Sequence, residues 1–77
     1  MVIDFKSGKI IATPHEIVVR LDGEHRVTLQ AQTDAIQLIG NGANVISVNG
    51  AECKWSIKLD NQEQLTVLAD AIGIAIL

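Results

Sequence analysis

Arg20 and Arg26 are the two residues whose type and spacing point most directly to a binding site. The alternating residues on either side of 22–24 predict a three-residue hairpin loop, which places the two arginines directly opposite each other on the outward face. Like charges so placed cost a few tenths of a kcal/mol, up to about 1 kcal/mol. An anion, or carboxylates from another chain, would offset that cost, whereas two splayed, solvated side chains would need neither. We therefore single out Arg20 and Arg26 as candidates for an anion or partner contact.

The histidines and the cysteine do not form a catalytic or metal-binding set. His15 and Glu16 could act as a general base with an orienting carboxylate, but adjacent residues on a strand point to opposite faces. His25 follows a turn, where an exposed side chain is expected. Cys53 falls on the inward face of an alternating strand, which favours a small core residue over a nucleophile. Because these residues show neither zinc-finger spacing nor an acid–base pair at a workable spacing, we expect no metal site and no catalytic residue. We also expect no cofactor.

The glycine-rich segment 40–45 begins like a dinucleotide-binding fingerprint. Val45 stands where that fingerprint requires glycine, and the segment opens a strand rather than a helix. A pyrophosphate would therefore lack the helix N-terminus that binds it. We expect instead a loop that supplies positive backbone φ angles.

Aliphatic residues exceed what one small core requires. After an inward set is assigned, a remainder lies on outward strand faces or off the apolar stripe of the expected C-terminal helix. These residues are Val2, Ile11, Val18 and Val45 on the strands, and Val67, Ile74 and Leu77 near the helix. Scattered surface aliphatics are normal, but a continuous patch marks an interface. The sequence therefore predicts a homo-oligomer that uses the C-terminal helix. Its candidate interface residues are Val18, Val67, Ile74 and Leu77.

Three hairpins position the strand residues. Their turns are expected at Ser7-Gly8, at 22–24 and at Asn49-Gly50, the last of which is the strongest short-range hairpin signal. The predicted pairs are Phe5 with Ile10 and Ile3 with Ala12, then Val19 with Val27 and Ile17 with Leu29, then Val48 with Ala51 and Ile46 with Cys53.

The last part of the chain predicts a helix. Residues 35–39 form either a short strand or a helical turn, and we favour the strand. After the strands, the apolar period changes from two residues to about 3.6, which predicts a helix over about 61–75. Asp60, with Glu63 three residues later, is expected to cap its N-terminus.

These elements predict one domain over residues 1–77, with strands over about 2–59 and the helix over about 61–75. The fold class is α+β: an antiparallel β-meander of six to seven short strands with one C-terminal α-helix packed on the sheet. This outline also resembles a small pleckstrin-homology-like roll. The chain departs from that roll in being shorter, and its tryptophan, Trp55, lies on a strand instead of in the helix.

Composition narrows the class of partner. The chain has 77 residues, 48% of them hydrophobic, and a formal net charge of −3. A sequence pI near 5.1 argues against nucleic acid and against an anionic membrane surface. No apolar stretch has the ~20 residues of a membrane-spanning helix, and the first residues lack the features of a secretory signal peptide. A lone cysteine forms no internal disulfide, so we expect a cytoplasmic protein with a reduced thiol.

The residues Met1-Val2-Ile3-Asp4-Phe5, followed by the segment 8–16, resemble a family of short uncharacterised bacterial proteins. The resemblance covers the whole chain. It implies a small free-standing bacterial protein and brings no assigned activity.

The sequence favours a non-enzymatic, self-associating protein-interaction module. Its expected partners are a second copy of the chain and, as a further candidate, another cytosolic protein. The alternative is a small-ligand or anion-binding domain that uses Arg20 and Arg26. An enzyme ranks third, because no acid–base pair stands at a workable spacing.

Overall fold

The structure follows the change in the spacing of apolar residues along the sequence, from a period of two residues to one of about 3.6. The computed structural model describes residues 1–50 and 54–77. Within these residues, strands occupy the alternating region and an α-helix follows them. The elements are β1 (Val2–Phe5), β2 (Gly8–Ala12), β3 (Glu16–Leu21), β4 (Thr28–Gln32), the 3-10 helix η1 (Thr33–Ala35), β5 (Ile36–Ile39), β6 (Val45–Asn49), β7 (Lys54–Lys58) and α1 (Gln62–Ile72).

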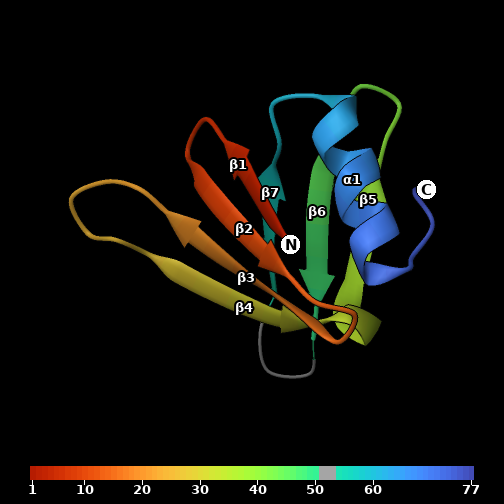
Figure 1. The fold of residues 1–77 in the computed structure, drawn as a ribbon, viewed down its shortest axis with the longest axis horizontal. Coiled ribbons are helices and arrows are strands. Elements are labelled where there is room, and N and C mark those ends of the chain that lie inside the picture. The colour runs from red at the N-terminus through yellow and green to blue at the C-terminus, as the bar shows by residue number, and fades with distance from the viewer. Residues whose placement is uncertain (51–53) are drawn as a thin grey trace.

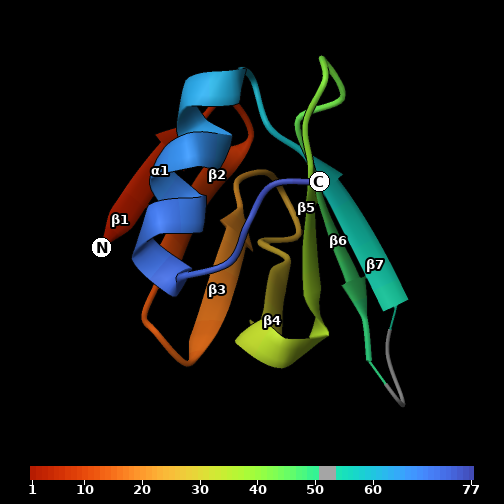
Figure 2. The same ribbon diagram turned by 90° about the vertical axis from the view of Figure 1, so that its right-hand side faces the viewer.

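The strands form two antiparallel sheets, each in chain order (Figure 1). The first four strands make one sheet and the last three make the other, with η1 between them. Figure 2 shows α1 beside β1 and β2, with which it makes contact. The predicted α+β class, the antiparallel meander and the C-terminal helix are confirmed, as is a strand within 35–39.

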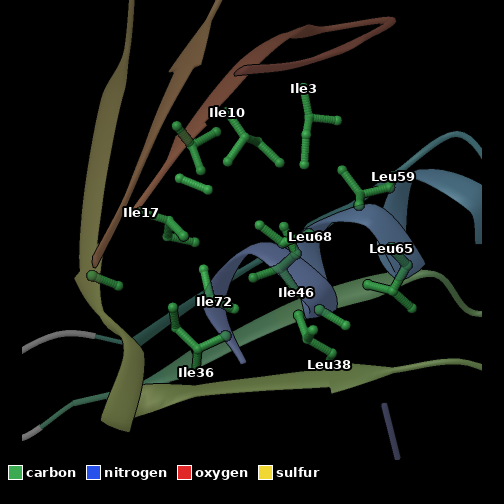
Figure 3. Packing of buried hydrophobic residues seen from close by; sticks show 14 of the residues in the cluster. Ile3, Ile10, Ile17, Ile36, Leu38, Ile46, Leu59, Leu65, Leu68 and Ile72 are labelled. Carbon is green, nitrogen blue, oxygen red and sulfur yellow. The ribbon is translucent and has the colours of Figure 1, made fainter. Parts of the chain in front are cut away.

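The core lies between the inner faces of the two sheets and α1 (Figure 3). All buried side chains of the described residues are apolar, and the core draws on both sheets and the helix. The largest fully buried side chains are Ile10, Ile17, Val19, Leu38, Ile46, Leu59, Leu65 and Leu68. On each strand of the larger sheet, the buried residues alternate with outward ones, as a sheet with one covered face requires.

α1 is shorter than the sequence predicts. Asn61, not Asp60, is the N-cap residue: its side chain accepts a hydrogen bond from the Gln64 N–H at 2.9 Å. The Gln64 side chain in turn accepts a hydrogen bond from the Asp60 N–H at 2.9 Å, a role that we expected of Glu63. The helix ends directly before Gly73, whose φ of 73° is left-handed, so it does not extend over the expected 61–75.

The residues after α1 return to β5. Ile76 forms a parallel bridge with Leu38. The Leu77 N–H donates to the Leu38 carbonyl at 2.7 Å, and the Leu77 carbonyl accepts from the Gly40 N–H at 3.0 Å. Figure 2 shows this tail running from α1 to β5, whose free edge it covers. No helix in residues 1–50 and 54–77 is long and apolar enough to cross a membrane.

The first hairpin keeps its predicted faces but not its predicted pairs. Ile3 lies opposite Ile10, and the turn occupies residues 6–7. Gly8 belongs to β2 instead of the turn, because β3 passes very close to it. A Cβ atom at Gly8 would lie 1.9 Å from the Arg20 carbonyl oxygen, so only glycine fits there.

The second hairpin differs in the same way. Val19 lies opposite Leu29, not opposite Val27, and the strand connection spans residues 22–27. Val27 is exposed, and its carbonyl accepts a hydrogen bond from the Leu21 N–H at 2.8 Å. The hairpin therefore has a longer connection than the predicted three-residue loop.

In the third hairpin, Ile46 lies opposite Ile57, so its predicted pairing with Cys53 is wrong. Cys53 itself falls in 51–53, outside the described residues. The loop expected at 40–43 is confirmed: residues 40–44 connect β5 and β6, with positive φ angles at Asn41, Gly42 and Asn44.

Candidate functional site

The outer face of the four-stranded sheet carries two neighbouring rows of side chains with different chemistry. A row here is a set of outward residues that the register places opposite one another. The apolar row consists of Val2, Ile11 and Val18, and on β4 the register continues it with the exposed, polar Gln30. The charged row consists of Asp4, Lys9, Arg20 and Thr28. Successive outward residues on a strand are about 7 Å apart, so the two rows are adjacent.

The apolar row takes no part in the core. None of Val2, Ile11 and Val18 belongs to the buried cluster or to the half-buried side chains packed against it. Val2 is 58% exposed, and the other two are half-buried. Residues directly opposite on antiparallel strands have Cβ atoms about 4.5–5.5 Å apart. The outward aliphatics predicted on these strands therefore form a continuous strip and are not scattered.

On β3, an acidic residue lies on the side of the apolar row away from the charged row. Glu16 comes two residues before Val18 on β3, and Arg20 comes two residues after it. The Glu16 carboxylate accepts a hydrogen bond from the Gln30 side-chain amide at 2.6 Å. The outer face of β3 thus presents an acid, an aliphatic residue and a cation in sequence.

A hollow of about 500 Å³ lies where the charged row meets the β3–β4 connection. Lys9, Arg20 and Arg26 line it together with Asp22 and Thr28, and we call it the cationic hollow. The β3–β4 connection projects beyond the sheet on the side away from α1 (Figure 1). None of the three cationic side chains takes part in a hydrogen bond among the described residues. Half of the chain's six basic residues therefore gather at one place.

The predicted placement of Arg20 opposite Arg26 is wrong, although both line the same hollow. Arg20 lies between Lys9 and Thr28 across the strands, because the register of the second hairpin differs from the prediction. Arg26 lies in the connection with a φ of 48°. Left-handed backbone at a non-glycine residue costs on the order of 1 kcal/mol, so the surrounding structure must hold it there.

The candidate interface residues at the C-terminus differ in how far they are exposed. Val67 is 36% exposed on α1, but Ile74 is half-buried and packs against the core. Leu77 is exposed beside Ile39, through the backbone bonds that join the tail to β5. Val18 lies on the other sheet, in the apolar row. The structure thus gives Val18 aliphatic neighbours, Ile11 and Val2, on its own sheet.

The remaining polar candidates form no metal-binding cluster in the described part of the chain. His15 is exposed, and its backbone N–H donates to the Thr13 hydroxyl at 3.3 Å. Across residues 1–50 and 54–77, no group of three or more His, Cys, Asp or Glu side chains could hold a metal ion. Cys53 falls outside those ranges.

Lys9 and Thr28 are the site residues that sequence reasoning missed. Their places beside Arg20 depend on two registers at once, that of β2 with β3 and that of β3 with β4. The one signal in the sequence is that both are outward residues of strands adjacent to the strand of Arg20.

Comparison with known proteins identifies a family without an assigned activity. No curated protein and no solved structure matches the chain. A family model described as "Protein of unknown function (DUF3389)" matches residues 1–76. The match includes the apolar row, the cationic hollow and α1, and it confirms the resemblance to a small uncharacterised family. The chain belongs to this family of proteins of unknown function, DUF3389.

Proposed function

We propose that this protein is a non-enzymatic interaction module that binds a second copy of itself through the outer face of the four-stranded sheet. The observation that carries this proposal is the apolar row, bordered by Arg20 on one side and by Glu16 on the other. Its three aliphatic residues have no role in the core of their own chain. A partner face would remove them from water, which is the main favourable term in most protein association.

A two-fold axis along the apolar row gives complementary contacts. Rotation by 180° about this axis places the outer face of the second copy over that of the first. β3 of the second copy then lies above β3 of the first and runs in the opposite direction. The apolar row then meets the same row of the other copy, as an isologous interface requires. Arg20 and Glu16 are equally spaced on either side of Val18. Each Arg20 is therefore placed over the partner's Glu16, and the dimer contains this pair twice.

The charged row also disfavours a two-fold axis that lies in the plane of the sheet parallel to the strands. Rotation about an axis parallel to the strands would bring the charged row onto itself. Lys9 and Arg20 of one copy would then oppose the same cations of the other, which is unfavourable. Charge complementarity thus favours the axis along the apolar row.

The interface is small, and we expect a weak dimer. Complete burial of a Val or Ile side chain contributes roughly 1.5–3 kcal/mol, and less for Ile11 and Val18 because they are already half-buried. Six side chains at about 1–1.5 kcal/mol each contribute about 6–9 kcal/mol. Association costs on the order of 4 kcal/mol or more in lost translational and rotational freedom. With about 0.5 kcal/mol from each of the two Arg20–Glu16 pairs, the difference is about 3–6 kcal/mol, which corresponds to a dissociation constant of about 40 µM to 6 mM.

We place this self-association in the bacterial cytoplasm. A single cysteine suits a reducing compartment, and a net charge of −3 opposes binding to nucleic acid and to anionic membranes. Another cytosolic protein with a matching face is a further candidate partner.

Sedimentation equilibrium over about 10 µM to 2 mM protein tests the proposal. We expect the wild-type chain to change from monomer to dimer, and Val18→Glu to stay monomeric because it buries a carboxylate in the apolar row. The control is Val67→Glu, which makes the same change on exposed α1 surface and should leave the dimer intact. A wild-type monomer throughout, or dissociation by Val67→Glu but not by Val18→Glu, would overturn the proposal.

A further inference from the structure

The cationic hollow has a charge that its own chain does not balance. Lys9 on β2 is directly opposite Arg20 on β3, and Arg26 lines the same hollow from the β3–β4 connection. Like charges opposite each other on a sheet are destabilising. Three of the six basic residues line this one hollow, in a chain whose formal net charge is −3.

The acidic groups nearby are fewer than these cations and, within the described part of the chain, form no hydrogen bond to them. Asp4 lies opposite Lys9 on β1, and Asp22 lines the hollow. Neither carboxylate forms a hydrogen bond to Lys9, Arg20 or Arg26 among the described residues. Three cations against one lining carboxylate leave the hollow net positive.

Arg26 is held in a conformation that arginine does not favour. Its φ of 48° lies in the left-handed region, and the neighbouring Val27 carbonyl is tied to the Leu21 N–H at 2.8 Å. Such local strain gathers at binding sites, where the surrounding structure maintains it. Here the strained backbone brings a second guanidinium to the hollow.

The donors of the hollow match one class of ligand. Two guanidinium groups offer planar pairs of N–H donors that fit phosphate oxygens in a bidentate manner, and the Lys9 ammonium adds a point charge. The Thr28 hydroxyl can donate a further hydrogen bond. At about 500 Å³ the hollow is within the usual range of small-molecule sites and exceeds what a single oxyanion needs.

We propose that the cationic hollow binds a phosphate group, free or carried by a small molecule. Arg20 and Arg26 bind its oxygens, and Lys9 and Thr28 complete the contact. This site is complete in one copy of the chain, so it does not require self-association.

Titration of the ¹⁵N-labelled full-length chain with inorganic phosphate, followed by amide chemical shifts, tests the site. Sodium chloride keeps the ionic strength constant, and the protein concentration stays in the monomeric range. We expect saturable shifts at Lys9, Arg20 and residues 26–28. Glycerol 3-phosphate forms a second arm of the titration. Equal affinity for both probes assigns free phosphate, and tighter binding of the ester assigns a carried phosphate.

Arg26→Asn is the informative variant, because asparagine tolerates left-handed backbone and removes only the guanidinium. We expect it to weaken phosphate binding about tenfold or more, since it removes charge-assisted hydrogen bonds. Lys58→Gln removes one cation from exposed β7 and should change the affinity little. Lys9→Gln should weaken binding as a second, independent variant, and the amide spectrum of each variant shows whether it is folded. No saturable shift in the wild type, or equal weakening by Arg26→Asn and Lys58→Gln, would overturn the site.

Discussion

Reversing the charges on β3 is the sharpest test of how two copies meet. In the proposed dimer, Arg20 faces the partner's Glu16, and the two-fold axis makes this pair twice. Within one chain the two residues are four positions apart on the strand, or about 13 Å. That separation exceeds the Debye length of about 8 Å at physiological salt, so coupling within the chain is screened. Any strong coupling between these positions must arise between chains.

The expected magnitude follows from the exposure of the pair. An ion pair at the rim of an interface contributes about 0.5 kcal/mol, and reversing one charge replaces this attraction with a repulsion of similar size. The change is about 1 kcal/mol per pair and about 2 kcal/mol per dimer. Arg20→Glu should therefore raise the dissociation constant about 30-fold, and so should Glu16→Arg. The double variant restores both pairs in reverse orientation and should return to within about threefold of the wild type.

Sedimentation equilibrium at physiological salt and at about 1 M salt measures these constants. High salt shortens the Debye length to about 3 Å and should reduce the differences among the variants. Lys58→Glu is the matched control: like Arg20→Glu it takes the net charge of each copy from −3 to −5, but on exposed β7. If Lys58→Glu weakens the dimer as much as Arg20→Glu does, the effect is general repulsion. If the double variant fails to recover, the two-fold axis is not along the apolar row.

Three further predictions concern stability, and each is measured by urea or thermal denaturation of the monomer. Gly8→Ala should destabilise the fold by roughly 1–3 kcal/mol, because its Cβ would lie 1.9 Å from the Arg20 carbonyl oxygen; an unchanged midpoint would show that β2 and β3 can separate at little cost. Leu68→Ala should cost about 2–5 kcal/mol, because Leu68 is fully buried between the helix and the sheets, and a loss below about 1 kcal/mol would contradict that packing. Asn61→Ala should cost about 1 kcal/mol through loss of the bond to the Gln64 N–H, whereas Asn61→Ser should retain most of the stability.

The sequence predicts which face each strand residue occupies far better than it predicts which residue lies opposite. Ile3 pairs with Ile10 instead of Ala12, and Ile46 pairs with Ile57 instead of Cys53. In each case the partner differs by an even number of residues. The physical reason is that burial of one sheet face forbids odd slips, which would turn every apolar residue outward. Even slips keep the faces, so the sequence offers only local turn preference for choosing among them.

Turn preference proved the weaker guide because tertiary contacts override it. Gly8 reads as a turn residue in the sequence, yet it is used inside β2, where β3 leaves no room for a side chain. Tertiary packing also overrides the local pattern after the C-terminal helix. In the sequence, Ile74 is surplus apolar surface off the stripe of the expected helix, but Gly73 ends the helix and Ile74 packs against the core.

In the candidate site too, the sequence predicts the faces of the strand residues but not their partners across the strands. The outward positions of Val2, Ile11 and Val18 follow from alternation alone, and the structure confirms them. Their alignment into one row, and the meeting of Lys9 with Arg20, require correct pairs in adjacent hairpins. A two-residue error in register was enough to replace Thr28 with Arg26 as the neighbour of Arg20.

Arg20 belongs to both proposed contacts, so the two cannot be energetically independent. A phosphate group in the cationic hollow neutralises the charge that attracts the partner's Glu16, and the partner's Glu16 in turn reduces the charge available to phosphate. By thermodynamic linkage, each ligand must weaken the other by the same factor. That factor is limited by the strength of the ion pair itself, about 0.2–1 kcal/mol, or at most about fivefold per pair. The apolar row is unaffected by phosphate, so the anion weakens the dimer without abolishing it, and a complete loss of dimer would require phosphate to act through something other than Arg20.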